Sequence, residues 1–134
     1  QLSNNSSDEY HITVTSAIQT NDGGYIITGG ESDSIWSFTS LYLLKTDING
    51  NQQWKYKFGN VNSGDAGECI QQTNDGGYIV TGTTNVSEIG SMFTESDLFL
   101  LKTDISGTEQ WSMIFGNNFN GAHLWGALLL GKAK

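Results

Sequence analysis

The chain of 134 residues repeats itself, and this repetition restricts the fold more than any other feature. Residues 20–26 (TNDGGYI) return unchanged at 73–79, a shift of 53, and residues 43–48 (LLKTDI) return at 100–105, a shift of 57. The two shifts differ by four residues, which places one insertion in a loop between the matched segments. A chain with this pattern must fold as two similar units.

Each repeat is expected to contain four short strands joined by tight turns. Asp-Gly and Gly-Gly supply the positive φ that hairpin turns require, and β-branched and aromatic residues follow them. In the first repeat the expected strands are 15–19, 25–28, 41–46 and 53–58, and in the second they are 68–72, 78–81, 97–103 and 110–115.

The pattern of apolar residues indicates which strand faces are covered. Trp54, Tyr56 and Phe58 alternate with lysines, so that strand is expected to pack on one face. Residues 41–44 and 98–101 are apolar at every position, so these third strands are expected to be covered on both faces. The predicted fold is all-β, with two four-stranded antiparallel propeller-like blades plus strand-like N- and C-terminal segments.

Residues 41–54 (LYLLKTDINGNQQW) resemble the tryptophan-docking blade of quinoprotein-like propellers, and the DGGYI hairpin resembles the tandem repeats of secreted prokaryotic propeller proteins. The resemblance covers about residues 13–117. It implies the blade fold, and no motif for a quinone is present, so no cofactor is expected.

The repeats divide the chain into four parts. Residues 1–12 form an N-terminal polar segment and strand, 13–60 the first blade, 61–117 the second blade, and 118–134 an apolar C-terminal strand or tail. Closed propellers have at least four blades, so two blades leave two apolar faces uncovered. The chain is therefore expected to close a ring with other copies, to extend into a filament, or to be a fragment of a longer propeller.

Both ends of the chain contain strand-like segments, at residues 10–16 and 123–130. An apolar strand at a chain end needs a sheet edge to receive it, so we expect pairing with an adjacent chain. The alternative is a terminal strand that pairs within its own blade. The candidate residues for inter-chain pairing are Ile12, Val14, Leu124, Trp125, Leu128 and Leu130.

The longer loops, 30–40 and 82–96, place aromatic residues beside carboxylates. This combination suits sugar binding, and it suits a subunit contact equally well. Packing of the loop on its own side chains is the third alternative. The candidate ligand or interface residues are Glu31, Asp33, Trp36, Phe38, Met92, Phe93 and Glu95.

The charge balance is acidic, with 6 Lys and Arg against 14 Asp and Glu and a net charge of −8. This disfavours binding to nucleic acid or to anionic membranes, and no apolar run is long enough for a membrane span. The first residue is Gln1, which suggests a processed or excised form. Glycosylation sequons begin at Asn4, Asn5 and Asn85, and together these features favour an extracellular or cell-surface location.

No motif for catalysis or metal binding occurs, so no catalytic residue and no metal are expected. The repeated acids Asp22, Asp75, Asp47 and Asp104 stand in turns, where a carboxylate caps its own backbone. The prediction is a non-enzymatic extracellular structural protein that assembles with copies of itself into a ring or filament. The alternatives are a carbohydrate-binding lectin formed by ring closure of two-blade chains and a fragment of a larger protein-binding propeller.

Overall fold

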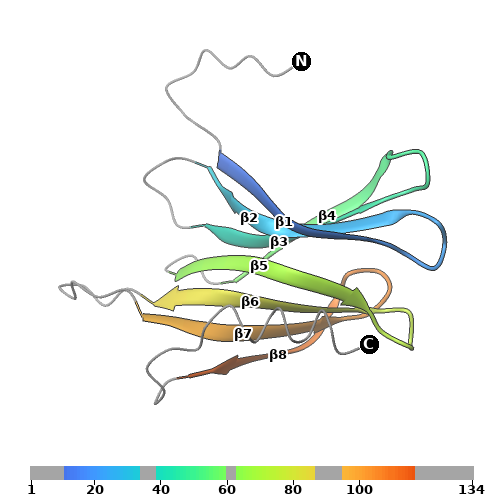
Figure 1. The fold of residues 1–134 in the computed structure, drawn as a ribbon. Helices are drawn as coiled ribbons and strands as arrows, with labels where there is room; N and C mark the ends of the chain where they lie inside the picture. Colours follow the sequence, from blue (N-terminus) through green and yellow to red (C-terminus); the bar gives the residue numbers. More distant parts are fainter. Residues whose placement is uncertain (1–10, 34–38, 60–62, 87–94, 117–134) are drawn as a thin grey trace, which may run out of the picture.

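The computed structural model describes residues 11–33, 39–59, 63–86 and 95–116, and within them the chain forms two four-stranded antiparallel sheets (Figure 1). Sheet 1 has the order β1-β2-β3-β4 and sheet 2 the order β5-β6-β7-β8. The strands are β1 (His11–Gln19), β2 (Tyr25–Ser32), β3 (Ser40–Thr46), β4 (Gln52–Phe58), β5 (Ser63–Gln72), β6 (Tyr78–Val86), β7 (Glu95–Thr103) and β8 (Glu109–Phe115). The predicted all-β class with two repeated four-stranded sheets is confirmed. No helix of the described ranges has the length and apolarity that crossing a membrane needs.

All eight strands are longer than the sequence predicts, because pairing with a neighbouring strand extends them. The ladder between β1 and β2 continues to the pair His11–Ser32, and the ladder between β5 and β6 continues to the pair Ser63–Val86. β1 is therefore one continuous strand that crosses the expected boundary after residue 12. Backbone hydrogen bonding carries β2 through Gly29 and Gly30, which side-chain patterns do not mark as a strand.

The β1–β2 and β5–β6 turns have the same geometry. In the first, the Thr20 N–H donates to Gly24 O at 2.9 Å and the Gly23 N–H donates to Thr20 O at 2.9 Å. Gly23 and its counterpart Gly76 both have a φ of 87°, a conformation that side chains disfavour. The expected positive φ is thus confirmed at the first glycine of each Gly-Gly pair.

A carboxylate holds each of these turns together. Asp22 Oδ1 accepts hydrogen bonds from the Thr20 hydroxyl at 2.5 Å and the Gly24 N–H at 2.9 Å, and Lys45 Nζ lies 3.0 Å from Oδ2. Asp75 makes the same bonds in the second repeat. Asp47 and Asp104 accept backbone N–H bonds in the β3–β4 and β7–β8 turns. All four repeated acids cap their own turns, as the sequence predicts.

The two sheets stack face to face, and the described part of the core lies between them (Figure 1). Each fully buried aliphatic side chain contributes about 1.5–3 kcal/mol through the apolar surface that it removes from water. Sheet 1 contributes Ile26, Leu41 and Leu43, and sheet 2 contributes Ile70, Tyr78, Val80, Phe99 and Leu101.

Polar bonds fix how the sheets lie on one another. The Thr15 hydroxyl donates to Gly67 O, the Asn21 N–H donates to Gln72 Oε1 at 2.8 Å, and the Asp65 N–H donates to Thr39 O at 2.8 Å. A methyl group at Gly67 would overlap the Thr28 side chain, so the sheets approach closely where that glycine lies. The stacking is therefore specific as well as apolar.

The third strands differ in how they are covered. β3 matches the expectation, because Tyr42 on its outer face is buried beneath Lys55 and its hydroxyl donates to Thr13 O at 2.9 Å. In β7, Leu98 and Leu100 are only partly buried. No second layer covers that face within the described residues.

Candidate assembly surfaces

The contact between the sheets includes a tryptophan held by two elements of the other sheet. Trp54 of β4 lies with its ring centroid 6.2 Å from that of Tyr78, at the start of β6. It stacks on Tyr56 at 5.3 Å. A Cβ at Gly107, in the β7–β8 turn, would come within 2.8 Å of the Trp54 ring, so this turn must carry a glycine for the ring to lie there. Trp54 is thus enclosed by its own strand, a strand start and a turn.

The same face of sheet 2 is open. Trp111, Met113 and Phe115 of β8 occupy the repeat positions of Trp54, Tyr56 and Phe58, and they are 45%, 55% and 46% exposed. Every residue of β8 is exposed, whereas Trp54 and Phe58 of β4 are partly buried against sheet 2. We call Trp111, Met113 and Phe115, with Leu98 and Leu100 beside them, the donor face.

The outer face of sheet 1 is open at the complementary positions. Tyr25 is 39% exposed, whereas its counterpart Tyr78 is 1% exposed beneath Trp54. Among the described residues, no heavy atom lies within 4 Å of the place where a Cβ of Gly50 would be, whereas its counterpart Gly107 meets Trp54. Gln19 is exposed at the position of Gln72. We call Gln19, Tyr25 and Gly50 the acceptor face.

Glu31 does not lie in a loop, and the loop position predicted for it is wrong. It belongs to β2, where the strand pairing described above continues past the glycines, and it is 2% exposed. Lys55 Nζ lies 2.7 Å from its Oε2, at angles outside those of a hydrogen bond, and Lys57 Nζ lies 3.6 Å from its Oε1. Glu31 is therefore paired within its own sheet.

Asp33 follows β2 and is exposed, with Lys57 Nζ 3.3 Å from its Oδ1. An exposed pair of this kind contributes little to stability. Of the predicted ligand residues, Glu95 begins β7, and its side chain lies outside the described set. Trp36, Phe38, Met92 and Phe93 lie outside the described residues.

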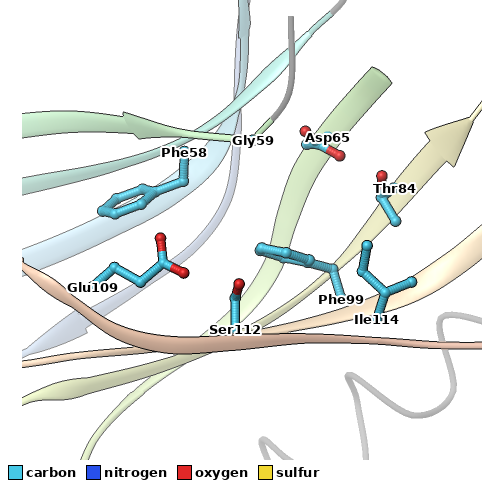
Figure 2. A pocket seen from close by; sticks show the side chains of 8 residues that line it. All are labelled: Phe58, Gly59, Asp65, Thr84, Phe99, Glu109, Ser112 and Ile114. Atoms are coloured by element: carbon cyan, nitrogen blue, oxygen red, sulfur yellow. The ribbon is translucent and has the colours of Figure 1, made fainter. Parts of the chain in front are cut away.

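A cavity of about 210 Å³ lies between the end of β4 and sheet 2 (Figure 2). Phe58 and Phe99 supply apolar wall, while Asp65 and Glu109 supply carboxylates. Aromatic rings beside carboxylates are the combination that the sequence predicts in the loops for sugar recognition. In this cavity the combination is formed by residues other than the predicted ones. The remaining lining residues are Gly59, Thr84, Ser112 and Ile114. In the described ranges, no three His, Cys, Asp or Glu side chains gather as a metal site.

The terminal residues predicted to pair between chains are described only at the N-terminal end. Ile12 and Val14 are exposed, and they pair with Glu31 and Gly29 of β2 in the same chain. β1 is an edge strand, so pairing of its other edge with another chain stays a prediction. Leu124, Trp125, Leu128 and Leu130, like Asn4 and Asn5, lie outside the described residues. Asn85 lies in β6, and its side chain is not described.

Sequence reasoning predicted two uncovered faces but did not name the residues that form them. The signal was available in the repeat itself. Terminal units of a repeat array lack one neighbour, so each residue buried at the internal contact has an exposed counterpart at an end. Applying the shifts of 53 and 57 to Tyr78, Gly107 and Trp54 identifies Tyr25, Gly50 and Trp111.

Compared with protein-family models and with curated proteins, the chain matches none of them. Its surfaces are therefore interpreted from their own geometry.

Proposed function

We propose that this chain is a non-enzymatic structural protein that associates with copies of itself through the free faces of its two sheets, forming a ring or a filament. The observation that carries the proposal is the donor face. Three large apolar side chains, Trp111, Met113 and Phe115, stand about half exposed along one strand. Trp54 and Phe58, the counterparts of Trp111 and Phe115 in sheet 1, pack against a second sheet, while Tyr56, the counterpart of Met113, is itself 46% exposed.

The physical argument rests on the cost of leaving such a face in water. Contiguous exposed apolar patches mark interaction surfaces, whereas single exposed apolar residues are ordinary. Burying apolar surface is favourable by roughly 25 cal/mol per Å², and a stacked neighbour would bury such surface on both partners. Each sheet in the chain already uses one face in this way, which supports the same use of the other.

An extracellular or cell-surface location is part of the proposal. It is supported by the low content of charged residues, 15%, and by the sequons at Asn4, Asn5 and Asn85. Only a chain that enters the secretory route of a glycosylating cell would receive glycans at these asparagines.

The first test is the mass of the full chain in solution, measured by light scattering after size exclusion, with negative-stain imaging of the same fractions. Discrete particles of a few chains support ring closure, and long threads support the filament. A monomer at every concentration tested would overturn the proposal.

A further inference from the structure

We infer that the second copy docks head to tail, with its acceptor face on the donor face of the first, so that Trp111 of one copy lies between Tyr25 and Gly50 of the next. This inference rests on the proposed self-association and specifies its partner and geometry. The template is the contact inside the chain, where Trp54 lies between Tyr78 and Gly107.

The donor side of the inferred contact repeats the internal one. Trp111 corresponds to Trp54 and Phe115 to Phe58, and Met113 replaces Tyr56 with a side chain of similar reach. Register within the sheets is also the same, because Lys45 pairs with Trp54 and Lys102 pairs with Trp111. The side chains of β8 are therefore presented as those of β4 are.

The acceptor side has matching space. Gly50 and Gly107 have the same φ of 84°, so the two turns have the same shape where the tryptophan ring would lie. At Gly107 the space is filled by Trp54, and at Gly50 no described atom fills it. The exposed ring of Tyr25 stands where Tyr78 contacts Trp54.

The acceptor face also holds the counterpart of a polar residue that bonds across the internal contact. Inside the chain, Gln72 Nε2 donates to Gly76 O at 2.9 Å, and this orients Oε1 to accept the Asn21 N–H. Gln19 Nε2 donates to Gly23 O at 3.1 Å, so the side chain is already held in the corresponding position. Its partner is the N–H of Asn74, the counterpart of Asn21, in the copy that contributes the donor face.

Besides the replacement of Tyr56 by Met113, the two contacts differ in the first strands and where Tyr42, beneath Lys55, stands at the position of Phe99. Val14 stands at the position of Gly67, which the internal contact requires to be small because Thr28 lies against it. Glu68 stands at the position of Thr15, whose hydroxyl donates to Gly67 O across the sheets. The inferred contact therefore lacks this close approach and this hydrogen bond, and it is weaker than the contact inside the chain.

Crosslinking with a short bis-maleimide tests the inferred contact between copies. The full chain is used with its single cysteine replaced, Cys69→Ser, so that only the introduced cysteines react. The control variant, Asn21→Cys with Gln72→Cys, places its pair at the internal contact and should crosslink within one chain. The test variant, Gln19→Cys with Asn74→Cys, places the corresponding pair on the two free faces. We expect it to yield covalent dimers and a ladder of higher species, and adding Trp111→Ala should abolish them.

The outcomes separate this inference from the proposed function. Particles of several chains that give no ladder, while the control pair crosslinks, would overturn the head-to-tail contact and leave self-association standing. A monomer would overturn both. A monomer that begins to associate once residues 118–134 are removed would assign the donor face to that segment, which also overturns the inference.

A second variant tests the contact without relying on loss of function. Val14→Gly with Glu68→Thr restores the small residue and the hydroxyl donor of the internal contact. One hydrogen bond contributes about 1 kcal/mol, so the dissociation constant should fall about fivefold to tenfold. An unchanged or higher dissociation constant would mean that the first strands do not face one another between copies, contrary to the inference.

Discussion

At the scale of single residues, charged side chains hold the hairpins together. Lys45 is 3% exposed, and a lysine is rarely buried without partners. Its Nζ donates to Asp22, to Thr46 O at 2.8 Å and to Gln53 Oε1 at 3.1 Å. The second glycine of each Gly-Gly pair must also lack a side chain, because a Cβ at Gly24 would overlap Thr46 O and a Cβ at Gly77 would overlap Thr103 O. The short turn motif thus contains both the glycines that form the turn and the carboxylate of Asp22, which pairs with Lys45 on the third strand.

The free energy of unfolding should depend on pH through the carboxylate of Asp75. A hydrogen bond from the Thr73 hydroxyl, with others from the Gly77 N–H and Lys102, lowers the pKa of Asp75 to about 2 from the usual 3.8. Because the folded pKa is below the unfolded one, the stabilisation is complete above about pH 4 and is lost as the pH falls toward 2. The Asp75→Asn variant should therefore unfold at lower urea than the wild type at pH 7, with a difference that shrinks below pH 4.

The control for this experiment is Asn74→Ser, which changes the neighbouring exposed side chain of the same turn. It should leave the pH profile of the unfolding midpoint unchanged. If Asp75→Asn kept a constant difference down to pH 2, the carboxylate would not be the group responsible.

At the scale of elements, β4 and β8 have corresponding sequences and different surroundings. Each carries an aromatic or apolar residue at three alternate positions, and each pairs with an apolar third strand. β4 has sheet 2 beside it, whereas no described residue covers the face of β8 that carries Trp111, Met113 and Phe115. Burial at these strands depends on the neighbouring sheet and not on the strand itself.

This difference predicts unequal effects of the same substitution. Trp54→Ala should lower the free energy of unfolding by about 2–3 kcal/mol, somewhat under the 3–5 kcal/mol of a fully buried tryptophan. Trp111→Ala should cost less than about 1 kcal/mol, since the side chain is half exposed. Urea unfolding of both variants at the lowest workable protein concentration, where association is minimal, provides the measurement. Equal losses would show that the donor face is covered within the chain.

At the scale of the whole molecule, the net charge of −8 opposes the association that the apolar faces favour. Like charges on two copies repel over a distance that salt shortens, from about 30 Å at 0.01 M to about 8 Å at 0.15 M. The acceptor side of sheet 1 carries Lys55 and Lys57, but Glu31 and Asp33 offset them. Long-range repulsion is therefore the main electrostatic effect.

Association should consequently strengthen with salt. Sedimentation velocity at ionic strengths of about 0.01 M and 0.15 M should show a larger share of oligomers at the higher value. The Trp111→Ala variant should remain dissociated in both. Weaker association at high salt would mean that ion pairs between copies, rather than the apolar faces, hold the assembly together.

The sequence by itself determined the strands, their turns and the number of sheets, because hairpin pairing is local and its signals lie within a few residues of one another. The pairs Asp22–Lys45 and Asp75–Lys102 repeat because the motifs repeat. Only the tertiary structure decided that Glu31 belongs to a strand and that Trp54 is covered while Trp111 is open. These outcomes depend on which face of each sheet packs against a neighbouring sheet. Two identical motifs have the same sequence whether or not a sheet packs on them, so the motif alone does not tell the covered copy from the exposed one.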